Sequence, residues 1–119
     1  MAIHNELGTW GETQAIRYLE RKGYQIIGRD WKSGRRDIDI IALDDDVVVF
    51  VEVKTRRNNM FGEPEEAVDY RKQQNLIQAI NHFVKQNHIR QDIRFDILSV
   101  VGIPGNEPEI RHIKDVALL

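Results

Sequence analysis

Residues 37–54 read DIDIIALDDDVVVFVEVK, and this stretch decides the fold. Two runs rich in isoleucine and valine flank Asp44-Asp45-Asp46, a composition typical of two β-strands joined by a tight turn. The strands are expected over residues 37–43 and 47–54. Together they predict a β-hairpin in the middle of the chain.

The length of the turn fixes which side chains of the hairpin share a face. If the loop holds only Asp45 and Asp46, counting back places Asp39 directly opposite Glu52. Their Cβ atoms would then lie about 4.5–5.5 Å apart. A four-residue loop would keep both carboxylates on one face at a diagonal, whereas a three-residue loop without a bulge would put them on opposite faces.

Alternation along the second strand sorts its side chains into two faces. The valines at odd-numbered positions share one face, which is expected to belong to the core, and Glu52 and Lys54 share the other. Alternation alone would explain these two residues as a surface pair on a polar outer face. Asp39 is harder to explain in that way, because aspartate is depleted in strands and here stands between two isoleucines.

The rest of the chain predicts two helices and further strands. Apolar residues at three- and four-residue spacing indicate a helix over residues 5–22, which Gly23 would end. Pro64 with its acidic neighbours marks the start of a second helix, whose helical stripe comprises Leu76, Ile80, Phe83, Val84 and Asn87. Strands are expected over residues 24–28, 94–101 and 109–113, with a turn or loop over residues 31–35 and a loop over residues 102–108.

This order, α-β-β-β-α-β-β, predicts an α/β fold with a mixed central β-sheet flanked by helices. The crossover through the second helix would let the strand that begins at Arg94 lie parallel to an earlier one. At 119 residues, the chain is expected to form a single domain over residues 1–119.

Composition limits the classes of protein that the chain can belong to. Apolar residues make up 41% and charged residues 30%, a globular balance. The lack of cysteine excludes disulfides, thiolate zinc sites and a cysteine nucleophile. The N-terminus has no basic flank leading into an apolar stretch, and the longest apolar run is only Val47 to Val51. These features favour a cytoplasmic protein without a membrane segment.

The charge is distributed unevenly although its sum is small. A net charge of −2 argues against a protein that coats nucleic acid by bulk electrostatics. However, Arg35 and Arg36 precede the first strand of the hairpin, and Arg56 and Arg57 follow the second. These four arginines are candidate phosphate contacts, although solvated loop cations would give the same pattern.

The carboxylates of the hairpin suggest a chemistry. Asp39 and Glu52 at the expected separation would repel each other unless a cation lay between them, and oxygen-only ligands suit Mg²⁺ or Mn²⁺. Such a cation could polarise a phosphate oxygen, while Lys54 could stabilise the developing charge or position a water. Glu12 lies at the edge of the apolar face of the first helix and could add a third carboxylate, or be an ordinary flanking glutamate. The chemistry predicted is phosphodiester hydrolysis.

Several short motifs follow one another along the chain. They are Leu7-Gly8-x-x-Gly11-Glu12, Gly23-Tyr24, Asp37-Ile38-Asp39-Ile40-Ile41-Ala42, Phe50-Val51-Glu52-Val53-Lys54-Thr55-Arg56, Phe61-Gly62, Ala67-Val68 and Lys72-Gln73. The spacing from Asp39 to Glu52-Val53-Lys54 resembles that of the PD-(D/E)XK nucleases, the restriction-endonuclease-like superfamily. The whole set is similar to the YraN-like family of uncharacterised bacterial proteins, which is related in pattern to archaeal Holliday-junction resolvases.

The resemblance implies a nuclease site made of Glu12, Asp39, Glu52 and Lys54, in which the three carboxylates bind Mg²⁺ or Mn²⁺. It also implies cleavage of DNA, with branched DNA as one candidate substrate, and makes a homodimer plausible. Lys72 begins the second helix where related nucleases place a supporting polar residue, and it is a further candidate contact to nucleic acid or a solvated helix residue.

Two positions depart from the family pattern. The usual Gly-Glu before Ile-Asp is here Arg36-Asp37, and the proline that gives the superfamily its name is replaced by Ile38. All four positions of the expected site are intact. Two alternatives stay open: a nucleic-acid-binding module without independent catalytic activity, and a protein-interaction domain that uses its apolar strip. The sequence does not distinguish DNA from RNA as the ligand.

Overall fold

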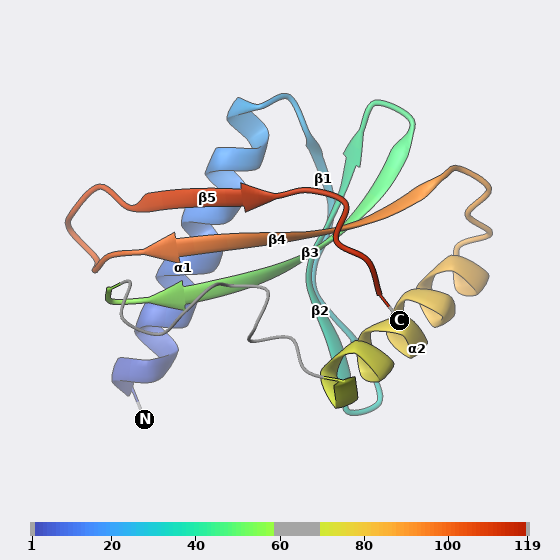
Figure 1. Cartoon of the computed structure of the whole chain (residues 1–119), viewed down its shortest axis with the longest axis horizontal. Coiled ribbons are helices and arrows are strands. Elements are labelled where there is room, and N and C mark those ends of the chain that lie inside the picture. The colour runs from blue at the N-terminus through green and yellow to red at the C-terminus, as the bar shows by residue number, and fades with distance from the viewer. Residues whose placement is uncertain (1, 59–69, 119) are drawn as a thin grey trace.

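The structure is a computed structural model and describes residues 2–58 and 70–118. Within these residues, one five-stranded sheet is flanked by two helices (Figure 1). The predicted α/β fold with a mixed sheet and its element order are confirmed. The elements are α1 (Ala2–Arg21), β1 (Gln25–Ser33), β2 (Arg36–Asp44), β3 (Val47–Arg56), α2 (Tyr70–Gln86), β4 (Ile93–Val101) and β5 (Glu109–Ile113).

The strands lie in the order β1-β2-β3-β4-β5, which is also their order in the sequence. β3 and β4 pair in parallel, and the other neighbouring strands pair antiparallel. A parallel pair needs a long connection, and the connection from β3 to β4 contains α2. The predicted parallel crossover is therefore confirmed.

The hairpin formed by β2 and β3 has the predicted register. Its two-residue turn is Asp45–Asp46, and the pairing runs from Asp44 opposite Val47 to Ile40 opposite Val51. Asp45 has a φ of 52°, a left-handed conformation that aspartate tolerates better than most residues. One further step in this register would place Asp39 opposite Glu52.

Beyond this point β2 and β3 separate, as Figure 1 shows. β2 stays paired with β1, where Trp31 lies opposite Ile38. Ile38 packs into the apolar cluster beneath α2. The side chain of Asp39 reaches back to β3, and its Oδ2 accepts a 2.8 Å hydrogen bond from the N–H of Val53. The split between the strands is thus bridged by a carboxylate.

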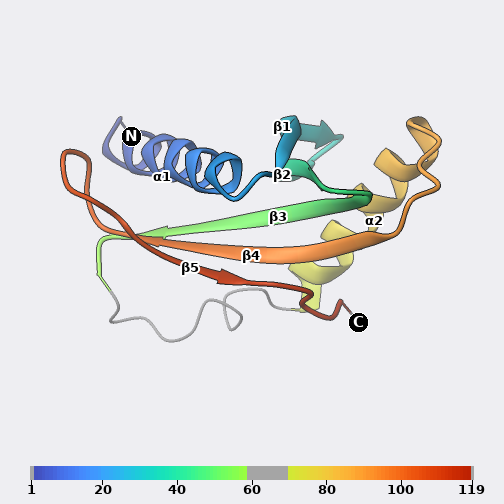
Figure 2. The ribbon, with the colours of Figure 1, turned by 90° about the horizontal axis from the view of Figure 1, so that it is seen from above.

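Both faces of β3 are buried over residues 48–52, so the polar outer face that alternation allowed for this strand is not found there. Val49 and Val51 pack on the α1 side together with Leu19, while Phe50 packs on the α2 side against Phe83. Figure 2 shows α1 along one side of β3 and β4. Because a helix covers the second face as well, Glu52, which shares that face with Phe50, is buried.

The sequence prediction was wrong about where β1 ends. Trp31 was assigned to a turn or loop, but β1 continues to Ser33 and the turn is Gly34–Arg35. The Trp31 ring packs edge-on against Phe83 of α2, with ring centroids 5.4 Å apart, and this long-range contact favours the extended strand. The helix start expected at Pro64 lies outside the described residues, as do the Phe61-Gly62 and Ala67-Val68 motifs.

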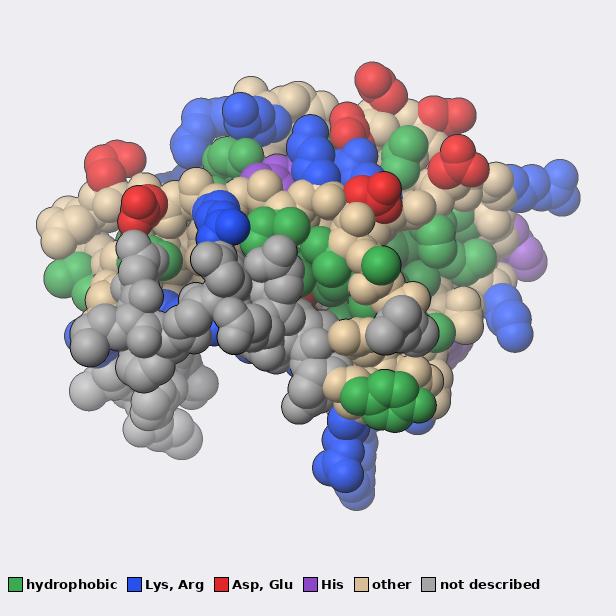
Figure 3. Space-filling view, viewed as in Figure 1, with side chains coloured by type: hydrophobic (Ala, Val, Ile, Leu, Met, Phe, Trp, Pro, Cys, Tyr) green, Lys and Arg blue, Asp and Glu red, His purple; other side chains and the backbone are tan. Residues whose placement is uncertain are grey.

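An apolar hollow of about 330 Å³ lies between α2, β4 and the segment that follows β5. Ile80, Phe95 and Leu118 are among the residues that line it, and Figure 3 shows hydrophobic side chains gathered in this part of the surface. None of the helices in the described ranges combines the length and apolar character needed to cross a membrane.

Candidate active site

Asp39 and Glu52 lie together where β2 and β3 separate. Glu52 is only 6% exposed, and both residues line a hollow of about 380 Å³ that is bordered by the first turns of α2. We call this the α2-side hollow. Its lining residues are Arg35, Arg36, Asp37, Asp39, Glu52, Val53, Lys54, Lys72, Asn75 and Leu76.

The Asp39 carboxylate is poorly compensated. Burial, and then the neighbouring Glu52 carboxylate, raise the pKa of Asp39 to about 7, against the opposing effect of the hydrogen bond from Val53. An aspartate in this state carries its negative charge at a free-energy cost near neutral pH. Perturbed carboxylates in clefts are candidates for functional residues.

Glu52, in contrast, has a counter-ion. Lys72, from the first turn of α2, forms an ion pair with Glu52 through Nζ and Oε2. Burial lowers the pKa of Lys72, but the hydrogen bond to Glu52 and the charge of that carboxylate, with smaller effects of Lys54 and Asp39, together raise it. Burial and the nearby Lys72 ammonium lower the pKa of Lys54. Two lysines from different elements therefore lie beside one buried carboxylate.

Glu12 approaches the split from the other side of the sheet. α1 packs closely on β3 at Gly11, where an added Cβ would lie 2.6 Å from Cγ2 of Thr55. Glu12 forms a 3.5 Å ion pair with Arg29, and burial together with Asp30 raises the pKa of Glu12. The absence of a side chain at Gly11 is what lets α1 bring Glu12 to this position.

A second hollow of about 430 Å³, which we call the α1-side hollow, lies beside Glu12. Asp39 and Lys54 line this hollow as well as the α2-side hollow. The two residues therefore face space on both sides of the split. The full lining is Gly8, Thr9, Glu12, Asp39, Val53, Lys54 and Thr55.

The expected phosphate contacts divide into two groups. Arg35 and Arg36 line the α2-side hollow together with Lys72. The Nε of Arg36 is buried and has no hydrogen-bond partner among the described residues. Arg56 and Arg57 lie at and just beyond the end of β3, and neither lines the α1-side or the α2-side hollow.

The donor set fits a hard divalent cation in its chemistry, because Glu12, Asp39 and Glu52 offer only carboxylate oxygens. The three side chains are not gathered into a closed cluster. In the described ranges, no group of three or more histidine, cysteine, aspartate or glutamate residues is arranged to hold a metal ion. Glu12 and Glu52 are instead paired with Arg29 and Lys72.

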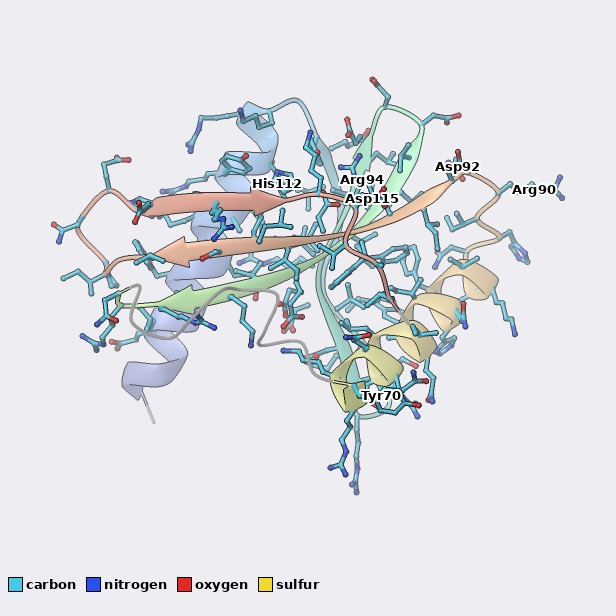
Figure 4. The ribbon with its side chains drawn as sticks, viewed as in Figure 1. Tyr70, Arg90, Asp92, Arg94, His112 and Asp115 are labelled. Atoms are coloured by element: carbon cyan, nitrogen blue, oxygen red, sulfur yellow. The ribbon has the colours of Figure 1, made fainter. Side chains whose placement is uncertain are left out.

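A second buried carboxylate, Asp96 of β4, was missed by sequence analysis. Asp96 is fully buried, and its oxygens accept hydrogen bonds from Nε and Nη2 of Arg94 at 2.9 Å, from Nε2 of His112 at 2.7 Å and from the N–H of Asp115 at 3.0 Å. Figure 4 shows Arg94, His112 and Asp115 along β4, β5 and the segment that follows. Burial alone would raise the pKa of Asp96, but the hydrogen bonds from His112 and Arg94 lower it to about 2.

Arg94 extends this network to the hairpin. Its Nη1 donates to Asp44 at the end of β2, and its Nη2 donates to the hydroxyl of Tyr24 at 2.8 Å. The network therefore ties the end of the hairpin to β4 and to the segment before β1. One signal could have identified it: Asp96 stands between Phe95 and Ile97, the same pattern that singled out Asp39.

Comparison with known proteins assigns the chain to a family without assigning it an activity. The family model described as uncharacterised protein family UPF0102 matches residues 11–100, a range that contains Glu12, Asp39, Glu52 and Lys54. The expected membership of an uncharacterised family is confirmed, while the nuclease superfamily stays a prediction.

Three bacterial relatives are similar over most of their length. A UPF0102 protein of Bacteroides thetaiotaomicron is 46% identical over 115 residues, 97% of this chain and 94% of the relative. A UPF0102 protein of Porphyromonas gingivalis is 45% identical over 113 residues, 94% of this chain and 84% of the relative. A UPF0102 protein of Flavobacterium psychrophilum is 41% identical over 115 residues, 97% of this chain and 96% of the relative. The chain therefore belongs to the uncharacterised protein family UPF0102.

Proposed function

We propose that this protein is a metal-dependent nuclease of the PD-(D/E)XK type that hydrolyses phosphodiester bonds in DNA. The observation that carries the proposal is the pairing of the half-buried Asp39 carboxylate with the buried Glu52 carboxylate at the split between β2 and β3, with Lys54 two residues further along β3. A purely structural carboxylate would be expected to have its charge compensated, and the raised pKa of Asp39 indicates that its charge is not.

Each residue has a distinct role in the proposal. Asp39 and Glu52, with Glu12 from α1, would hold Mg²⁺ or Mn²⁺ through their carboxylate oxygens. Such an ion, when bound, polarises a phosphate oxygen and increases the acidity of a coordinated water. Lys54, which lines both hollows, would donate a hydrogen bond to a non-bridging oxygen on which negative charge develops.

The cationic side chains beside the site would position the substrate by contacting its phosphates. Arg35 and Arg36 line the α2-side hollow and would contact phosphates of the bound strand. Because the net charge is −2, this local cluster rather than the whole surface would attract DNA. The resemblance to Holliday-junction resolvases makes branched DNA the first substrate to test, and a homodimer would suit cleavage of two strands.

The test is a cleavage screen with Mg²⁺ and with Mn²⁺ over linear duplex, single-stranded and branched DNA. The parent chain should cut at least one of these, and Asp39→Asn should lower the rate by a factor of roughly a hundred or more, because a catalytic ligand is removed. Asp46→Asn is the matched control. It makes the same change of charge in the turn at the opposite end of the hairpin and should leave the rate unaltered.

Two results would contradict the proposal. One is that no substrate is cut with either ion, and the other is that Asp39→Asn cuts as fast as the parent. Salt-sensitive DNA binding without cleavage, retained or strengthened in Asp39→Asn, would instead identify a nucleic-acid-binding module.

A further inference from the structure

The ion pair between Lys72 and Glu52 joins two elements across the candidate site. Glu52 lies on β3 with its side chain 7% exposed, whereas Lys72 lies on α2 with its side chain 36% exposed. A buried carboxylate without a partner would be strongly destabilising, so Lys72 supplies the charge that Glu52 requires. The partly exposed lysine, on a flexible four-carbon chain, can leave more easily than the buried glutamate can.

The position of Lys72 conflicts with a metal ion. The ammonium group contacts the Oε2 atom of Glu52, one of the oxygens that the proposed function assigns to the cation. A divalent ion bound to the same oxygen would place two cations in contact, at a large electrostatic cost. Lys72 and the metal ion therefore compete for one carboxylate.

The α2-side hollow offers Lys72 a second partner. Arg36 lines the same hollow, and its buried Nε has no hydrogen-bond partner within residues 2–58 and 70–118. Arg36, Lys54 and Lys72 would together surround an anion placed there, and a phosphate oxygen is the acceptor that suits both guanidinium and ammonium donors. A phosphodiester group would satisfy the donor that the protein leaves without a partner.

We propose that Lys72 is an exchangeable counter-ion: it holds Glu52 until a divalent cation displaces it, and it then turns with Arg36 to the phosphate of the substrate. This inference rests on the proposed function. It makes Lys72 a positioning residue that couples binding of the metal ion to binding of the phosphate. The site would pass from an ion pair within the protein to a metal ion and a substrate phosphate held side by side.

The experiment measures Mn²⁺ binding to the full chain without DNA, by electron paramagnetic resonance at fixed pH and ionic strength. Lys72→Met should bind Mn²⁺ roughly tenfold more tightly than the parent, because the ion no longer has to displace a charged hydrogen-bond partner. Lys72→Arg keeps a cation on Glu52 and should bind Mn²⁺ no more tightly than the parent. The matched control is Arg71→Met, which removes one positive charge from the adjacent exposed position of α2.

The outcomes separate this inference from the function on which it rests. If the parent binds Mn²⁺, Asp39→Asn loses that binding, and Lys72→Met binds no more tightly than Arg71→Met, the counter-ion role is wrong while the metal site stands. If neither the parent nor Lys72→Met binds Mn²⁺, both proposals fail. Tightening in Lys72→Met alone, with Lys72→Arg like the parent, supports the exchange.

Discussion

Asp39 on β2 and Asp96 on β4 are two aspartates of one sheet whose pKa values are shifted in opposite directions. Asp96 accepts hydrogen bonds from two side chains and one backbone N–H, and its pKa falls to about 2. Asp39 accepts the Val53 N–H but lies beside Glu52, and its pKa rises to about 7. Asp96 is fully buried and Asp39 half-buried, but burial acts to raise the pKa of both, so the opposite shifts come from their partners.

The two carboxylates differ in whether other groups of the protein compensate their charge. The charge of Asp96 is matched by Arg94, which also binds Asp44, so the network is complete without any ligand. The charge of Asp39 is opposed by another carboxylate and would be compensated by an added cation. A satisfied carboxylate stabilises a fold, whereas an unsatisfied one lowers stability and is retained where a ligand uses it.

The largest expected effect comes from Asp96→Asn. Removing this charge disrupts the ion pair of a fully buried carboxylate and leaves the half-buried Arg94 guanidinium without its main partner, so the free energy of unfolding should fall by about 3–5 kcal/mol. Chemical denaturation at pH 7 measures this value. Asp92→Asn, at an exposed position just before β4, is the control and should change it by less than about 0.5 kcal/mol. Equal stability of the two variants would contradict a structural role for Asp96.

The same variant gives a pH dependence with a definite sign. The pKa of Asp96 is about 2 in the folded chain and 3.8 ordinarily, so its contribution is present above pH 3.8 and is lost as pH falls toward 2. The stability difference between the parent and Asp96→Asn should thus be constant from neutral pH down to about pH 4 and shrink below it. A difference that instead grew on acidification would refute this assignment.

An intermediate effect is expected at the contact that positions Glu12. Gly11→Ala places a methyl group against Thr55 and should destabilise the protein by about 1–3 kcal/mol through overpacking. Gly8→Ala is the matched control on the same helix, where an added Cβ meets nothing within 4 Å, and it should stabilise by up to about 1 kcal/mol. Thermal unfolding measures whether the two substitutions change the stability in opposite directions. Destabilisation by both would show that the close packing of α1 on β3 is not specific to Gly11.

The smallest effect, and the most discriminating, is that of Asp39→Asn on stability without metal. The folded chain raises the pKa of Asp39 to about 7, so the ionised group destabilises the fold above that pH and ceases to do so as pH falls toward 4. The full shift would correspond to roughly 4 kcal/mol at pH 8, but solvent screens the half-buried carboxylate, so Asp39→Asn should be about 1–2 kcal/mol more stable than the parent at that pH in the presence of a chelator. This gain in stability should disappear near pH 4. If Asp39→Asn were instead less stable than the parent at pH 8, Asp39 would be a carboxylate that stabilises the fold, as Asp96 is.

The comparison also explains what sequence could predict. The hairpin and its register follow from local patterns, because a two-residue turn and the period of two fix which positions face each other. The burial of Glu52 and its contact with Lys72 do not, because they depend on a helix that packs across the sheet from a distant part of the chain. An aspartate between apolar strand residues marks Asp39 and Asp96 equally, and only their partners in space separate them.

Asp39 and Lys54 face both the α1-side and the α2-side hollow, so the proposed reaction centre is open in two directions. A polynucleotide bound there could continue past the scissile phosphate on both sides of the split instead of ending in a closed pocket. α1 would then contact the nucleotides on one side of the cut and α2 those on the other. Substitutions confined to α1 would then alter the nucleotide preference on one side of the cut, and substitutions confined to α2 would alter it on the other side.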